Sequence, residues 1–288
     1  MTATSGFSSF SKDLTMTKKK IDATPKTTTA ALATLPEAKL APLFGSPLAL
    51  DKLPGSGGDV TREEGVTLVV GRAYATRDRT VPASEVFFVP GAKPRGDGPW
   101  LREADKLSWR DEETGFECIM LRDTHGGHLC GYVGIPRDHP LWGWDHRAVP
   151  AELGVEVHGG LTYSRICEEG PSPARRLVAE ARRICHVPPS AVRYMPLEHA
   201  TEHRPGDAHA WWFGFSCNHV YDVVPGDRGD RARFLGAETA AEYRDDAYVV
   251  REILNLARQL RAIADGAPVP PREGPPLPAF GLDPKKGA

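Results

Sequence analysis

The sequence predicts an α+β fold in which a mainly antiparallel sheet carries a long C-terminal helix packed on one face. Strand-like runs separated by glycine turns come first along the chain. The long helical pattern follows them rather than alternating with them, an order typical of α+β proteins. No GxGxxG motif follows a strand-like run and no P-loop motif occurs, so the sequence disfavours a Rossmann-type or P-loop fold.

The strand pattern is clearest in the first half of the chain. Residues 66–74 (VTLVVGRAY) and 85–89 (EVFFV) are rich in β-branched and apolar side chains, and the second run stops at Pro90. Residues 116–123 (FECIMLRD) and 128–136 (HLCGYVGIP) flank the turn sequence THGG, whose glycines supply the positive φ that a tight turn needs. These two runs therefore predict a β-hairpin.

The second half of the chain contains two further strand patterns and two helix patterns. Residues 153–164 (LGVEVHGGLTYS) predict a strand that enters a glycine turn, and residues 173–184 (PARRLVAEARRI) predict a short helix. The aromatic run at residues 210–215 (AWWFGF) predicts a central strand that is covered on both faces. Residues 239–242 (TAAE) form a capping box, which predicts the start of a long helix with a broad apolar face.

The composition of the two ends predicts disordered tails. Residues 1–60 are dominated by Thr, Ala, Ser, Lys and Pro without a sustained period, and residues 266–288 are rich in Pro. Such segments bury too little apolar surface to offset the entropy lost on ordering. Residues 61–265 remain as a single α+β domain of about 200 residues, which is long enough for a well-filled core.

Charge and cysteine content limit the classes of binding partner and indicate the cellular compartment. A formal net charge of −2 provides no basic field for nucleic acid, and no segment approaches the ~20 apolar residues that cross a bilayer. The N-terminus has no apolar signal-peptide core, the five cysteines are odd in number, and no CxxC pair occurs. We therefore expect a cytoplasmic protein with reduced thiols, whose partner is a small-molecule ligand rather than nucleic acid or a membrane.

The stretch at residues 210–222 (AWWFGFSCNHVYD) is the main candidate for a functional site. Cys217 and His219 lie two positions apart, so they share a face of an extended chain. Asp222 can approach the His219 imidazole if the chain turns helical. His158 ends another strand-like run, and the two glycines after it permit a close backbone approach. The sequence therefore predicts that these four side chains share a polar pocket.

Three interpretations of this pocket stay open at the level of sequence. As a catalytic site, Cys217 is a thiol nucleophile that alkylates faster than the other four thiols, and His219, Asp222 and His158 assist it. As a metal site, His158, Cys217 and His219 bind zinc, Asp222 orients His219, and one position stays open for water. As a structural cluster, the group is a buried thiol beside hydrogen-bonded histidines. A lipase-like oxyanion loop is excluded because no GxSxG motif occurs.

Several blocks of the chain resemble an uncharacterised family of bacterial and phage proteins. The resemblance covers roughly residues 108–260 and is carried by CGYVGIPRDHPLWG, VEVHGGLTYS, WWFGFSCNH and YRDDAYVVREI. The family often has Asp before the cysteine and Ala after it, where this chain has Ser216 and Asn218. The resemblance implies a shared core and a shared polar cluster, made of His139, His158, Cys217, His219 and Asp222, and it implies no reaction.

Two functions follow as expectations. The first is a small metal- or thiol-dependent hydrolase or transferase that acts on a small molecule or nucleotide, with zinc as the expected metal. The second is a non-catalytic binding or accessory module of phage or mobile-element origin, in which the Cys/His cluster is structural.

Overall fold

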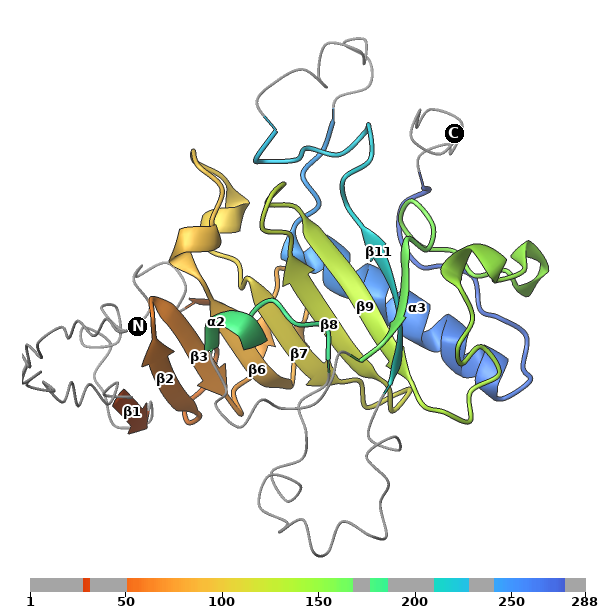
Figure 1. Cartoon of the computed structure of the whole chain (residues 1–288), viewed down its shortest axis with the longest axis horizontal. Helices are drawn as coiled ribbons and strands as arrows, with labels where there is room; N and C mark the ends of the chain where they lie inside the picture. Colours follow the sequence, from red (N-terminus) through yellow and green to blue (C-terminus); the bar gives the residue numbers. More distant parts are fainter. Residues whose placement is uncertain (1–27, 32–50, 168–176, 186–209, 228–240, 278–288) are drawn as a thin grey trace, which may run out of the picture.

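The computed structural model describes residues 28–31, 51–167, 177–185, 210–227 and 241–277 (Figure 1). In these residues nine strands form one sheet, in the order β1-β2-β3-β6-β7-β8-β9-β11-β10, and all neighbouring strands in it are antiparallel. One long helix, α3, follows the last strand. The prediction of a mainly antiparallel sheet with a long C-terminal helix is confirmed.

Most strands that are consecutive in the chain are also neighbours in the sheet, and only the last two exchange places, so that β11 pairs with β9 and β10 lies outside it. A separate two-stranded ladder joins β4 to β5. The elements are β1 (Thr28–Ala31), β2 (Asp59–Glu63), β3 (Val66–Val70), β4 (Tyr74–Ala75), β5 (Thr80–Val81), β6 (Ala83–Phe88), β7 (Lys106–Arg110), β8 (Glu117–Arg122), β9 (Leu129–Ile135), β10 (Tyr163–Ile166), α2 (Leu177–Glu180), β11 (Trp211–Ser216) and α3 (Asp246–Ala264), with short 3₁₀ turns at Pro90–Ala92, Pro99–Leu101, His146–Ala148 and Ala151–Leu153.

The predicted hairpin is formed by β8 and β9. Cys118 lies opposite Val133 in the register of this pair. In the connecting turn Gly127 has a φ of 70°, and the Asp123 carboxylate accepts a hydrogen bond from the His125 backbone N–H at 3.0 Å. Local turn chemistry and strand alternation agree here, and the hairpin prediction is confirmed.

Alternation along the strands sends side chains to two differently covered faces. One face shares its core with α3, and Gly131 of β9 gives α3 room, because a Cβ there would lie 2.6 Å from Ile253 Cγ1. The other face carries a second cluster that includes Ile119, Tyr132 and Trp212. The short helix α2 lies over β3 on this second side, so α2 and α3 flank the sheet from opposite sides (Figure 1).

In the described part of the chain, no helix combines the length and apolar character needed to cross a bilayer.

The aromatic strand differs from its predicted place in the sheet. β11 lies between β9 and β10 and is therefore next to the end of the sheet, not central. Phe213 and Phe215 point into the core shared with α3, whereas Trp212 points to the opposite face. Both faces of the strand are covered, because the layer containing Cys167 and Cys185 packs against Trp212.

The long helix begins later than its capping box predicts. Thr239 lies outside the described residues, and Glu242 is not helical: its backbone N–H donates to Tyr221 O at 3.2 Å. The N-cap is Asp245, whose side chain accepts a hydrogen bond from the Tyr248 backbone N–H. Pairing with a distant segment removes residue 242 from the helix, so the predicted start was wrong.

The predicted strand at residues 153–164 was also wrong for most of its length. Only Tyr163–Ile166 is a strand, and His158 lies in the loop that precedes it. Gly154, Gly159 and Gly160 all have positive φ, which interrupts an extended conformation. Of the predicted helix at residues 173–184, the described part contains the single turn Leu177–Glu180.

The packed domain extends beyond both predicted boundaries. Residues 51–60, assigned to the N-terminal tail, include the buried Leu53, and Lys52 Nζ lies 2.7 Å from the Asp246 carboxylate on α3. Residues 266–277, assigned to the C-terminal tail, return along α3, where Arg272 forms two hydrogen bonds with the buried Glu252. Specific ion pairs attach these two segments to α3. The composition of the segments alone does not indicate these ion pairs. The remaining tail residues lie outside the described part, except β1.

Candidate functional site

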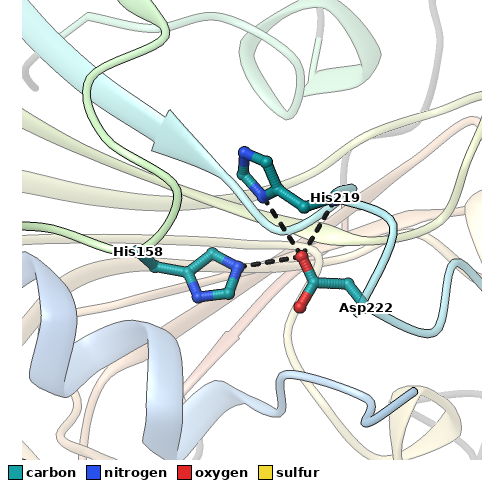
Figure 2. A group of neighbouring side chains, drawn as sticks. All are labelled: His158, His219 and Asp222. Atoms are coloured by element: carbon teal, nitrogen blue, oxygen red, sulfur yellow. Dashed lines mark hydrogen bonds and ion pairs between the residues drawn. The ribbon is translucent and has the colours of Figure 1, made fainter. Parts of the chain in front are cut away.

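Three of the predicted site residues converge on one point (Figure 2). His158 comes from the loop before β10, and His219 and Asp222 come from the turn that follows β11. Asp222 Oδ2 lies 2.8 Å from His158 Nε2 and 3.2 Å from His219 Nδ1. One nitrogen from each histidine and one carboxylate oxygen all lie within 4.8 Å of one another. These are ligand types that bind zinc and other divalent transition metals.

Gly159 makes this convergence sterically permissible. Its φ of 62° suits glycine, and the His219 imidazole lies directly against its Cα. A Cβ at position 159 would overlap the Cε1 and Nε2 atoms of that ring. The glycine therefore serves both as a turn residue and as the surface on which His219 rests.

Asp222 connects the two histidines of the group to each other and to Arg244. Its Oδ2 atom also accepts a hydrogen bond from the His219 backbone N–H at 2.9 Å, and its Oδ1 atom accepts one from Arg244 Nε at 3.0 Å. Burial by itself raises the pKa of this carboxyl, but hydrogen bonds from His158 and His219 outweigh burial and hold the pKa far below its usual range. Asp222 is therefore a carboxylate throughout the neutral pH range.

Helix α3 fixes the orientation of His158. The His158 backbone N–H donates to Glu252 Oε2 at 3.2 Å, and His158 Nδ1 lies 2.8 Å from the Tyr248 hydroxyl. Arg272 neutralises Glu252 through a bidentate ion pair. A partner on the far nitrogen is what sets the tautomer and ring orientation of a metal-binding histidine.

Aromatic rings enclose the two histidines. Tyr221 stacks on His219 with ring centroids 5.4 Å apart and planes at 12°, and the two imidazoles meet edge to face at 5.2 Å. The exposed fractions of His158, His219 and Asp222 are 0 %, 4 % and 2 %. The group is therefore almost completely shielded from bulk solvent. In this buried environment the electrostatic interactions among its members are stronger than they would be in water.

Cys217 is not part of this group. Its backbone N–H donates to Leu129 O at 3.1 Å, which continues the pairing with β9, and its side chain packs in the hydrophobic core. Burial, followed by the nearby Asp222 charge, raises the pKa of the Cys217 thiol well above its ordinary value. A thiol in this environment stays protonated at neutral pH and is a poor nucleophile.

His139, the remaining member of the cluster that the family resemblance implies, lies elsewhere. Its Nδ1 accepts the Leu141 backbone N–H at 3.0 Å, so its Nε2 carries the proton and donates to Leu260 O at 2.8 Å. Burial lowers the pKa of this imidazole. Both ring nitrogens are used in packing a loop against the end of α3, and His139 serves the core.

A cavity adjoins the group and includes residues that sequence reasoning missed. It has a volume of about 310 Å³, and its lining includes Arg77, Arg244, Tyr248 and Arg251. The guanidinium carbons of Arg244 and Arg251 lie 4.8 and 5.2 Å from the Tyr248 ring centroid. Tyr248 also contacts His158, and Arg244 contacts Asp222, so the cavity wall and the buried group share two side chains. The spacing of Arg244, Tyr248 and Arg251, four and three positions apart in YRDDAYVVRE, was the available signal.

The cavity has mixed charge and one unsatisfied donor. Arg77 and Arg251 are balanced by Asp78, and Arg244 is balanced by Asp222 and Glu242. In the described structure Arg251 Nε is buried without a hydrogen-bond partner. A buried guanidinium N–H of this kind is satisfied by an oxygen acceptor, such as a carboxylate or phosphate oxygen of a ligand.

Comparison with known proteins yields no relative: no family model matches the chain, and no curated protein or solved structure is similar to it.

Cys217 should react with iodoacetamide more slowly in the native protein than in the unfolded one, because its pKa is raised and its side chain is buried. Mass spectrometry of tryptic peptides after timed alkylation at neutral pH measures this rate. Protein alkylated in urea is the control, in which all five thiols react. A Cys217 that alkylates first in the native protein would restore the thiol-nucleophile interpretation.

Proposed function

We propose that His158, His219 and Asp222 bind a divalent metal ion, zinc by their ligand types, and that the protein is a cytoplasmic metal-dependent hydrolase or transferase. Its substrate is a small molecule with an anionic group. The observation that carries the proposal is the convergence of two imidazole nitrogens and one carboxylate oxygen within 4.8 Å, from segments 64 positions apart in the chain.

The separations within the group support a metal site. Ligand atoms about 2.1 Å from a zinc ion, at angles of about 90–109°, lie about 3.0–3.4 Å from one another. Asp222 Oδ2 lies 2.8 Å from His158 Nε2 and 3.2 Å from His219 Nδ1. All three ligand atoms lie within 4.8 Å of one another, so the pair farthest apart must approach by up to about 1.4 Å for all three to reach coordination distance.

The hydrogen-bond partners support the same proposal. In the hydrogen-bonded form, His158 Nε2 and His219 Nδ1 each carry a proton and donate to Asp222. In the metal-bound form the His158 proton moves to Nδ1, where the Tyr248 hydroxyl oxygen is in place to accept it at 2.8 Å. Arg244 holds Asp222 Oδ1, which directs Oδ2 to the metal. The proposal requires α3 to remain packed on the sheet, because α3 supplies Tyr248.

Each part of the site has a role in this proposal. A zinc ion lowers the pKa of a bound water toward ~7 and so supplies a hydroxide at neutral pH. Three protein ligands leave a coordination position for that water. Arg251 binds the anionic group of the substrate through its unsatisfied Nε and adjoining N–H groups. Tyr248 and Arg244 connect the substrate cavity to the ligands.

One observation favours the alternative function, a non-catalytic binding or accessory module. His158, His219 and Asp222 are nearly fully buried, which suits a structural cluster whose task is to hold Tyr248 and Arg244 at the cavity wall. In that case the cavity binds an anionic ligand without transforming it.

Zinc titration tests the proposal. Chelator-treated protein titrated with zinc chloride in a calorimeter should bind one ion per chain, and His219→Ala should abolish binding. Tyr248→Phe, which keeps the ring and removes the hydroxyl, should weaken zinc binding by about 10–100-fold. His125→Ala is the matched control, because His125 is exposed in the β8–β9 turn, and it should bind zinc like the wild type.

Two results would count against the proposal at different levels. Wild-type protein that binds no zinc, or a His219→Ala protein that binds it unchanged, would exclude the metal centre and leave the structural cluster. One bound zinc without hydrolysis of p-nitrophenyl phosphate or p-nitrophenyl carboxylate esters would support the binding module over the hydrolase.

A further inference from the structure

Two cysteines meet on the face of the sheet opposite α3. Cys167 directly follows β10, the outermost strand, and Cys185 lies five positions after the end of α2. Both belong to the cluster formed around Trp212 and Tyr132, whereas the core residues of α3 belong to the other face. The pair is therefore separate from the His158 group, and the proposed function does not use it.

The two thiols contact each other directly. Cys185 Sγ lies 2.8 Å from Cys167 Sγ, and the Trp212 indole N–H donates to Cys167 Sγ at 3.0 Å. Both residues are buried, with exposed fractions of 3 % for Cys167 and 8 % for Cys185. Neither is in a disulfide in the structure. The sulfurs need to approach by less than about 1 Å to reach the ~2.05 Å of a disulfide bond.

We propose that Cys167 and Cys185 form a reversible intramolecular disulfide when the protein meets a low-molecular-weight disulfide such as oxidised glutathione. The observations that carry this are the direct contact of the two sulfurs and the separation of the residues by 18 positions in the chain. Reduced thiols, the expectation from the cysteine count, then describe the protein only under reducing conditions.

The disulfide forms by thiol–disulfide exchange in two steps. The Cys185 thiolate attacks one sulfur of oxidised glutathione and releases one glutathione thiolate, which leaves a mixed disulfide on Cys185. The Cys167 thiolate then attacks the Cys185 sulfur and releases the second glutathione thiolate. In total two protein thiols are oxidised, one glutathione disulfide is reduced, and the two protein protons end on the two glutathione thiols. Cys185 reacts first because it is the more exposed of the pair.

The environment of the pair predicts a slow and persistent cross-link. The hydrogen bond to Cys167, followed by burial, raises the pKa of the Cys185 thiol, so little thiolate is present at neutral pH. Once formed, the disulfide is shielded by the same packing. It joins the edge strand β10 to the segment that continues from α2, and so fastens the layer over the second face to the sheet.

Peptide mapping of the full-length protein tests the inference. After incubation with excess oxidised glutathione and blocking of the remaining thiols, trypsin releases residues 166–175 and 184–193 as separate peptides unless a disulfide joins them. We expect a joined peptide lighter by two hydrogen atoms than its two parts, absent after reduction. Closing a loop of this length should raise the melting temperature by roughly 5–10 °C relative to the reduced protein.

Variants distinguish this inference from non-specific oxidation. Cys185→Ser should lose both the joined peptide and the rise in melting temperature. Cys118→Ser should keep both, because Cys118 is buried in the core on the α3 face. The inference is overturned if oxidation joins other cysteines, or if both thiols stay reduced in excess oxidised glutathione. It is also overturned if purified protein retains a thiolate-bound metal at this pair.

Discussion

Replacing Asp222 with alanine should lower the free energy of unfolding by about 3–5 kcal/mol, the cost of removing one partner from a buried ionic cluster. The Asp222 side chain is fully buried and accepts hydrogen bonds from His158, from His219 and from Arg244. Its loss leaves the Arg244 guanidinium without its buried partner and both imidazoles without their acceptor. The same change should abolish zinc binding, because it removes one of the three ligands that we propose.

Urea denaturation followed by circular dichroism measures the stability loss, and zinc titration measures the ligand loss. Asp97→Ala is the matched control, because this aspartate has an exposed side chain in the loop before the Pro99–Leu101 turn, and it should change stability by less than about 0.5 kcal/mol. Asp222→Asn keeps the shape of the side chain and should bind no zinc, which separates charge from packing. A loss below about 1 kcal/mol in Asp222→Ala would show that the cluster contributes little to the fold.

Replacing Trp212 with alanine should also cost about 3–5 kcal/mol, here by leaving a cavity in the second face of the sheet. Trp212 is completely buried, packs in the cluster with Ile119 and Tyr132, and donates its indole N–H to Cys167. At about 2–4 °C per kcal/mol for a domain of this size, the melting temperature should fall by roughly 10 °C.

Trp211→Ala provides the control for Trp212→Ala. It removes the same side chain one position earlier in β11, where the indole is only half-buried and its N–H donates to Trp144 O. This variant should retain most of the stability, and its effect should be clearly smaller than that of Trp212→Ala in a thermal melt. Equal losses in the two variants would contradict the assignment of Trp212 to a closed second face.

The sequence indicates the elements whose signals are local. The hairpin of β8 and β9 is readable because turn glycines and alternating side chains lie within a few positions of each other. The apolar stripe of α3 is readable for the same reason. The start of α3 at Asp246 could not be read from the sequence. Glu242 pairs instead with a segment 20 positions earlier, near Tyr221 and Asp222. A capping box competes with such pairing, and only the folded chain shows which interaction prevails.

In the candidate site, too, the sequence predicted some contacts correctly and others wrongly. The spacing of His219 and Asp222 allowed their contact to be predicted, because a turn after β11 brings residues three positions apart together. Cys217 was included because alternation predicts that it shares a face with His219. In the structure β11 ends at Ser216 and the chain bends at Cys217, whose backbone N–H still donates to Leu129 O of β9. Alternation describes an extended chain and does not indicate where that chain bends.

Composition, hairpin and helix stripe were thus determined by the sequence itself, because each depends on residues close together in the chain. The tertiary structure alone decided that His158 meets Asp222 across 64 positions, and that Tyr248 of α3 orients it. It also decided that residues 266–277 dock on α3 through Arg272 and Glu252. Contacts of this kind depend on the packing of whole elements, and their strength comes from burial, which no local pattern in the chain encodes.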